Sequence, residues 1–310
     1  MGFISEIFGY VLNWLYGLVN NYGIAIIIFS VILRVILIPI TIKQQKSMKK
    51  SAAIQGKMSE IQKKYKNNPE KLNQETIELY KKEKMSPFSG CLTSILQLVI
   101  ILAVFWLVSQ PLTYMKRIDA QVIENYTNEM KESGFNQNNN YVQIGLLDYA
   151  ETKYQELSEQ LAQEDVENRE EVEAKQEEYN SLRLNMEFLG IDLSKVPTQS
   201  LNDWRVYVIP VLYVITSFVS IRLTMMTQNK KKKKEIIVEN GEQKEEPDPM
   251  EQMQSMNKSM SYMMPIMSVM IAIIAPLGLA LYWLMSNILM IIERLVINKI
   301  MDSREEKAEE

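Results

Sequence analysis

The stretch GIAIIIFSVILRVILIPITIKQQ, residues 23–45, decides the fold class of this chain. Between residues 24 and 42 only Ser30, Arg34 and Thr41 are plainly polar. Because about 20 apolar residues are enough for a helix to cross a bilayer core, residues 24–42 are predicted to form a transmembrane helix. Arg34 lies near the middle of this helix, where a charge costs roughly 2.5–3.5 kcal/mol. A charge at that depth needs water, a cavity or a partner, which makes Arg34 the first candidate functional residue.

The composition supports a membrane protein and excludes several kinds of enzyme. The chain has 310 residues, of which 47% are hydrophobic, and a net charge of −4. Its mean hydropathy is only −0.12, because long apolar runs alternate with densely charged ones. Cys91 is the single cysteine, so there is no intramolecular disulfide, and the absence of histidine excludes a usual serine triad, His-bound zinc and His-ligated haem. No Walker-type phosphate loop is found either. We therefore expect no catalytic site and no cofactor.

Four further apolar segments make the predicted fold all-α and polytopic, with five transmembrane helices. The last apolar block, residues 260–297, is interrupted by Pro276 and Gly278, which favours a tight hairpin of two spans. The predicted spans after the first are residues 91–109, 206–226, 260–275 and 277–297, followed by a tail at 298–310.

The N-terminal residues 2–22 carry apolar side chains at helical spacing with polar ones between them. They lack the basic start and the small-residue cleavage site of a signal peptide. We predict an amphipathic helix that lies in the membrane interface. A short additional span is the alternative, which Gly9, Asn13 and Gly17 weaken.

Charge differs sharply between the two long connections. Residues 43–88 contain twelve lysines and five acids, and Asn67-Asn68-Pro69 divides them into two helical patterns. This predicts a cytoplasmic helical hairpin and an external N-terminus by the positive-inside rule, although such lysines also suit a merely solvated face. Residues 111–204 reverse the balance, with nineteen acids and eight basic residues, and are strongly helix-forming from Glu151 to Glu178. We expect an acidic extracellular insertion of two or three helices, or more simply a solvated spacer.

A third charged segment follows the span at 206–226. Residues 227–258 form a predicted basic, disordered linker. Its lysine run is expected to contact anionic lipids, at roughly 1 kcal/mol for each lysine, with ribosomal RNA as a weaker alternative. The run consists of Lys230, Lys231, Lys232, Lys233 and Lys234.

Taken in order, several motifs resemble those of the YidC (Oxa/Alb) family of membrane protein insertases, in a form similar to Gram-positive bacterial members. They are NYGIAIIIFSVILRVILIPITIKQQKSMKK at 21–50, SPFSGCLTSILQ at 86–97, FLGIDLS at 188–194, MSYMMPIMS at 260–268 and APLGLALYWLMSNILMIIE at 275–293. Each motif alone is weak, whereas the ordered set is specific. The segment 113–187 is longer than the connection usual in the family, and the resemblance says nothing about it.

The resemblance implies five helices around a hydrophilic groove that is open to the cytoplasm and to lipid. Arg34 matches the groove arginine and Ser30, one turn earlier, a polar groove position. On the second span Gln97 matches a motif glutamine, and on the third span Ser220 lies about where the family often has a glutamine. On the last span Trp283, which follows Tyr282, matches an aromatic position that faces substrate. These six residues form the predicted substrate groove.

The function implied by the resemblance is that of an insertase and chaperone in the bacterial plasma membrane, with a cytoplasmic C-terminus. Polar tails of nascent membrane proteins would cross through the groove, and apolar segments would pass into lipid. The ribosome and a secretion channel are further candidate partners, and DNA is not. The main alternative is a transporter in which Arg34 binds an anion, although no internal repeat of spans supports it. A structural ion pair with a buried carboxylate is the alternative role for Arg34. We favour a hydrated groove, because the only acid in the predicted spans is Glu293, near the end of a span and beside Arg294, so no partner is evident.

Overall fold

A computed structural model describes residues 2–66, 68–83, 89–135, 141–163, 168–235 and 269–309. The chain divides into two compact units. Unit 1 comprises Met1–Ile32, Val99–Tyr213 and Met270–Ser286. Unit 2 comprises Leu33–Leu98, Val214–Val269 and Asn287–Glu310. Three long helices, α2 (Tyr22–Ala53), α10 (Val208–Glu235) and α12 (Leu277–Glu309), contribute residues to both units.

Four helical segments of the described chain are long and apolar enough to cross a membrane. They are Gly2–Val19, Tyr22–Ser47, Trp204–Leu223 and Leu277–Ile300, and Leu98–Ser109 is a shorter apolar helix. The predicted spans 24–42, 206–226 and 277–297 thus coincide with apolar helices, and 91–109 falls within α5 (Ser89–Ser109). Of the predicted span 260–275 only the end is described, where residues 269–274 are helical. The chain is therefore an all-α membrane protein, while the arrangement of five spans around a groove stays a prediction.

The long helices continue beyond the predicted spans. α2 extends to Ala53, and α12 runs to Glu309 through the predicted tail. α10 extends to Glu235, so the first part of the predicted disordered linker is helical, and residues 236–258 lie outside the described chain. Lysine, glutamine, methionine and glutamate are good helix formers, so a helix that has started in the apolar segment propagates into these charged residues.

In unit 1, the first helix α1 (Gly2–Val19) packs through one face and leaves another exposed. Ser5 donates a hydrogen bond to the carbonyl oxygen of Ala103 in α5, at 3.0 Å. Gly9 lies directly against the backbone of Tyr114 in the short helix α6 (Pro111–Tyr114). The other face is apolar, with Phe3, Ile7, Tyr10, Trp14 and Leu18 exposed. An apolar free face fits lipid contact, and the interfacial position of α1 stays a prediction.

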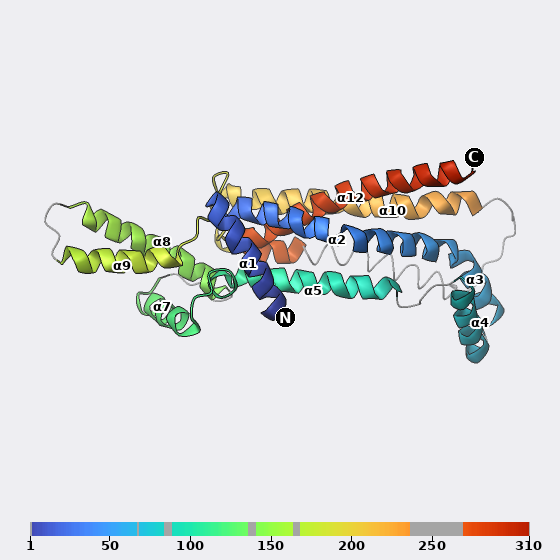
Figure 1. The fold of residues 1–310 in the computed structure, drawn as a ribbon, viewed down its shortest axis with the longest axis horizontal. Helices are drawn as coiled ribbons and strands as arrows, with labels where there is room; N and C mark the ends of the chain where they lie inside the picture. Colours follow the sequence, from blue (N-terminus) through green and yellow to red (C-terminus); the bar gives the residue numbers. More distant parts are fainter. Residues whose placement is uncertain are drawn as a thin grey trace. The chain divides into compact units, whose positions relative to one another are not determined.

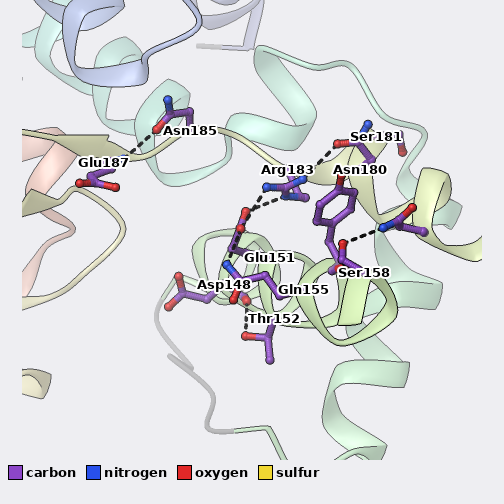
Figure 2. A network of polar contacts seen from close by, with 12 residues as sticks. Asp148, Glu151, Thr152, Gln155, Ser158, Asn180, Ser181, Arg183, Asn185 and Glu187 are labelled. Atoms are coloured by element: carbon purple, nitrogen blue, oxygen red, sulfur yellow. Dashed lines mark hydrogen bonds and ion pairs between the residues drawn. The ribbon is translucent and has the colours of Figure 1, made fainter. Parts of the chain in front are cut away.

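The acidic segment contains three helices, and we call it the acidic lobe; its extracellular location stays a prediction. The helices are α7 (Ala120–Glu132), α8 (Val142–Leu161) and α9 (Arg169–Leu182), and α8 and α9 lie side by side (Figure 1). The lobe has its own buried core of Met130, Leu146, Leu147, Tyr149, Tyr179 and Leu182. Figure 2 shows a polar contact between the end of α9 and the middle of α8: the Arg183 guanidinium donates two hydrogen bonds, of 2.6 and 3.0 Å, to the Glu151 carboxylate. The segment is therefore a packed structure rather than a solvated spacer.

A short antiparallel hairpin follows the acidic lobe, which the sequence analysis did not predict. It pairs β1 (Glu187–Phe188) with β2 (Ile191–Asp192). The Asn21 side chain donates to the carbonyl oxygen of Glu187 at 2.7 Å, and the Phe188 ring lies so close to Gly23 that a side chain there would collide with it. The hairpin is thus attached to the beginning of α2.

In unit 2, α3 (Gln55–Lys64) and α4 (Pro69–Lys82) form the predicted helical hairpin. Pro69 is at the start of α4, and the Asn68 side chain caps it by accepting from the backbone N–H of Lys71 at 3.1 Å. Lys57 pairs with Glu83 across the hairpin at 2.9 Å. These contacts define the start of α4 at Asn68 and Pro69, and the cytoplasmic location of the two helices stays a prediction.

Candidate functional site around Arg34

Arg34 lies on α2 within unit 2 and forms an ion pair with Glu293 on α12. Its Nε is 2.9 Å from Oε2 of Glu293, and the two side chains are only 16% and 7% exposed. The atoms are not aligned as a hydrogen bond, so the contact is electrostatic. The expectation that Arg34 has no acidic partner is wrong.

The reason lies in the reach of the two side chains. The sequence places Glu293 near the end of a span and beside Arg294, so it was not evident as a partner for Arg34. Arginine and glutamate both have long side chains, so a guanidinium and a carboxylate on neighbouring helices can meet without lying at the same level. A carboxylate near the end of one span can therefore reach an arginine deeper in another.

α10 contributes further polar groups to unit 2 through two contacts with α12. Asn287 donates its side-chain amide to the Ser217 hydroxyl at 2.8 Å. Arg294 donates to the carbonyl oxygen of Ser220 at 3.4 Å, and both serines are buried. We call these residues, with Arg34 and Glu293, the Arg34 cluster.

The Arg34 cluster has three ionisable groups, two guanidinium and one carboxylate, and so carries one excess positive charge. Arg34 and Ser220 were predicted from the sequence as groove residues. Ser217, Asn287 and Arg294 were not, and Glu293 was not expected to pair with Arg34. A signal was present, because Asn287 and Arg294 are seven residues apart and Ser217 and Ser220 three, spacings that place each pair on one face of an apolar helix.

The other predicted groove residues belong to different surroundings. Ser30 is buried in unit 1, where its hydroxyl donates to the carbonyl oxygen of Ile26 in its own helix at 2.7 Å. Tyr282 is buried, and Trp283 lies against Tyr213 of α10 with ring centroids 6.0 Å apart. The side chain of Gln97 lies outside the part of the chain that the structure describes. Contact of these four residues with substrate stays a prediction.

The charged groups at the Arg34 cluster are not arranged as a metal site. Among the described residues no group of three or more histidine, cysteine, aspartate or glutamate side chains could hold a metal ion. Within the cluster, Glu293 is the one carboxylate, and it faces a guanidinium. What the arrangement can do is exchange partners: an anionic group could take the place of Glu293 beside Arg34.

Fold and site thus define a multi-pass α-helical membrane protein with a polar, positively charged cluster within its spans. Residues 14–305 match the model of the family described as 60Kd inner membrane protein. The chain belongs to this family, and the membership predicted from its motifs is confirmed.

Individual relatives carry the name membrane protein insertase YidC. The protein from Caldanaerobacter subterraneus subsp. tengcongensis is 43% identical over 105 residues, which are 34% of this chain and 51% of that one. Those from Fusobacterium nucleatum and Syntrophobacter fumaroxidans are 39% and 40% identical, over 33% of this chain and 50% and 19% of their own lengths. The chain thus spans about half or less of the length of these relatives. Their names support an insertase and give no support to the alternative of an anion transporter.

Proposed function

We propose that this protein is a membrane protein insertase and chaperone of the bacterial plasma membrane. The observation that carries the proposal is a charged cluster built from three helices in a member of a family whose relatives are named insertases. Its substrates are nascent membrane proteins, whose polar tails pass through a hydrated groove along α2, α10 and α12. Family membership also favours the ribosome and a secretion channel as partners.

The physical task is to lower the barrier for a polar tail. Each unpaired backbone polar group costs several kcal/mol in hydrocarbon, and polar side chains that reach partway into the bilayer remove part of this penalty. Once the tail has crossed, partitioning of the apolar segment into lipid drives insertion. This step needs no nucleotide.

The ion pair changes how Arg34 would act on a substrate. With Glu293 in place, the charge of Arg34 is balanced, so a substrate carboxylate has to exchange with Glu293 rather than meet a bare cation. Two unit charges 4 Å apart interact by about 4 kcal/mol at an effective dielectric constant of 20. Because the exchange trades one such contact for another, it is close to neutral, and the excess charge supplied by Arg294 biases it toward acidic tails.

The lysine run adds a contact with the membrane surface. Lys230 to Lys234 follow the third apolar segment directly, where we place them at the cytoplasmic headgroups. Anionic lipids there would hold the inner end of α10.

The test is insertion of a single-span substrate with an acidic tail into liposomes that contain the purified protein. We expect protein-dependent insertion that falls at least several-fold in Arg34→Ala and persists in Arg222→Ala, an exposed arginine of α10 outside the cluster. Glu293→Gln should speed insertion, because the competing carboxylate is gone. Insertion that needs the protein but ignores all three changes would keep the function and remove the cluster from it, whereas no insertion with several substrates would refute the function.

A further inference from the structure

Three large apolar side chains are exposed between the acidic lobe and the beginning of α10. Leu189 at the turn of the β-hairpin is 86% exposed, and Leu201 and Trp204 are 69% and 74% exposed. We call these three residues the apolar rim. The hairpin strand β2 contacts the short helix η2 (Trp204–Tyr207), so the rim is one local surface.

Leu189 has a backbone conformation that is unusual for leucine. Its φ is +51°, in the left-handed region, followed by Gly190 at +76°. Glycine and asparagine adopt this conformation more easily than leucine does. A leucine that is both strained and almost fully exposed is explained neither by the turn nor by packing within the chain, which indicates that its side chain has a partner outside it.

The rim is held in place by Arg205, next to Trp204. The guanidinium donates to the carbonyl oxygen of Gly190 at 3.1 Å and to both carboxylate oxygens of Asp203 at 2.9 and 3.2 Å. The turn is therefore fastened to the segment that begins α10. On its other side the hairpin is attached to the beginning of α2 through Asn21 and Gly23.

The depth of the apolar rim in the membrane follows from the two places where the hairpin is attached. The candidate spans Tyr22–Ser47 and Trp204–Leu223 begin at the two points of attachment. The first residues of a span lie at the boundary between headgroups and hydrocarbon, where tryptophan is enriched because it has an apolar body and a polar N–H. Side chains fixed to both beginnings lie at this boundary.

Charge decides what kind of contact this is. The segment 111–204 carries nineteen acids against eight basic residues, so an anionic lipid surface repels it. The guanidinium of Arg205 is already neutralised by Asp203. The attraction must come from apolar burial, which does not depend on the charge of the lipid.

We propose that the apolar rim inserts into the lipid interface at the outer ends of α2 and α10 and anchors the base of the acidic lobe to the membrane. The occupant of this surface is phospholipid, bound through its acyl and glycerol region rather than through its phosphate. The inference needs only that α2 and α10 cross the membrane, and it is independent of the insertase proposal.

The experiment uses the full chain in vesicles of zwitterionic phosphatidylcholine. A Cys91→Ser background allows an environment-sensitive fluorophore to be attached at Leu189→Cys, with Val122→Cys, an exposed apolar position on α7, as the matched control. We expect brominated lipid to quench the label at residue 189 and aqueous iodide to quench the label at residue 122. A label at residue 189 that iodide reaches and brominated lipid does not would overturn the proposal. Lipid quenching at both positions would overturn it as well, because the contact would then not be specific to the rim.

A second variant separates lipid contact from a structural role. Leu189→Asn keeps a residue that tolerates the left-handed turn but removes the apolar side chain. In a protein whose other tryptophans, Trp14, Trp106 and Trp283, are replaced by phenylalanine, we expect this change to reduce quenching of Trp204 by brominated lipid and to shift its emission to the red. The midpoint of thermal unfolding in detergent should stay the same or rise. A clear fall in that midpoint would assign Leu189 to the folded structure instead of to lipid.

Discussion

At Arg34 the bilayer and a neighbouring helix act on the same charge. An unpaired arginine at this depth costs roughly 2.5–3.5 kcal/mol, and the Glu293 carboxylate at 2.9 Å offsets part of this penalty. Breaking one half of such a pair leaves the other charge buried without its partner, which is the more expensive state. The stability of the folded chain and the proposed exchange of Glu293 for a substrate carboxylate therefore depend on the same ion pair.

A double-mutant cycle on this pair gives the first prediction. We expect Arg34→Ala and Glu293→Ala each to lower the free energy of unfolding in detergent, and the double variant to lose less than the sum of the two. Residues in direct contact usually show a coupling of about 0.5–3 kcal/mol, and the low exposure of both side chains favours the upper half of this range. If the two losses simply add in thermal or denaturant unfolding, the ion pair does not stabilise the folded chain.

Individual residues differ in how well the sequence predicted their part in the site. Arg34 was predictable because a charge in an apolar helix is conspicuous. Its partner was not, because residues 34 and 293 are distant in sequence and only the fold brings their side chains together. Ser30 is conspicuous in the sequence for the same reason, yet a polar residue in a span does not need a partner outside its helix. Its hydroxyl donates a hydrogen bond to the carbonyl oxygen of Ile26 in the same helix.

At the scale of elements, the contact of α1 with α6 depends on a glycine. A Cβ at residue 9 would collide with the backbone carbonyl of Tyr114, which cannot rotate away, whereas a Cβ at Gly17 would meet nothing within 4 Å. We therefore expect Gly9→Ala to lower the stability by about 1–3 kcal/mol through overpacking. Gly17→Ala should raise it by about 0.5–1 kcal/mol, because alanine is the better helix former.

Thermal unfolding of the two alanine variants in detergent is the measurement. Both variants replace glycine by alanine in α1, so Gly17→Ala controls for the change in helix propensity that Gly9→Ala also makes. Equal effects of the two changes would show that α1 does not pack against α6 in the folded protein.

The acidic lobe should respond to alkaline pH through Lys116. Its ammonium group donates to the carbonyl oxygen of Ser181 at 2.5 Å, and burial, aided by the charge of Arg183, lowers the pKa of Lys116 to about 8. In the unfolded chain the pKa of lysine is about 10.4. Between these two values the unfolded chain holds a proton that the folded chain has released, so the free energy of unfolding rises with pH across this window.

Lys116→Met should abolish this rise. The slope can reach about 1.4 kcal/mol per pH unit, and partial exposure of Lys116 makes it smaller. We expect the midpoint of thermal unfolding of the wild type to increase relative to that of Lys116→Met between pH 7.5 and 9.5. Lys131→Met, at an exposed lysine of α7, should follow the wild type; a parallel course of wild type and Lys116→Met would contradict the prediction.

Elements were predictable from the sequence where one strong local signal defines them. Apolar length defined the helices α2, α10 and α12, and Asn68-Pro69 defined the start of α4. The β-hairpin was missed because strands of two residues have no periodicity to detect. Its existence depends on contacts with Asn21 and Gly23, far away in sequence.

At the scale of the whole molecule, charge is divided between the two connections in a way that predicts the orientation of the chain in the membrane. Residues 43–88 carry twelve lysines against five acids, and residues 111–204 carry nineteen acids against eight basic residues. The positive-inside rule counts lysine and arginine close to the ends of spans and gives little weight to acids. Lys43, Lys46, Lys49 and Lys50 follow the first span directly, so these lysines, rather than the acids of the acidic lobe, are expected to fix the topology.

The position of these lysines predicts which surfaces of the protein face outward. In a Cys91→Ser background, a cysteine at Gln160, exposed at the end of α8, should react with a membrane-impermeant maleimide in intact cells. A cysteine at Asn73, exposed on α4, should react only after the membrane has been opened. Because the orientation follows from the four lysines, replacing them together with glutamine should yield a mixed population in which residue 73 becomes partly reactive in intact cells. Labelling of residue 73 and protection of residue 160 in the unaltered background would reverse the topology and place the acidic lobe in the cytoplasm.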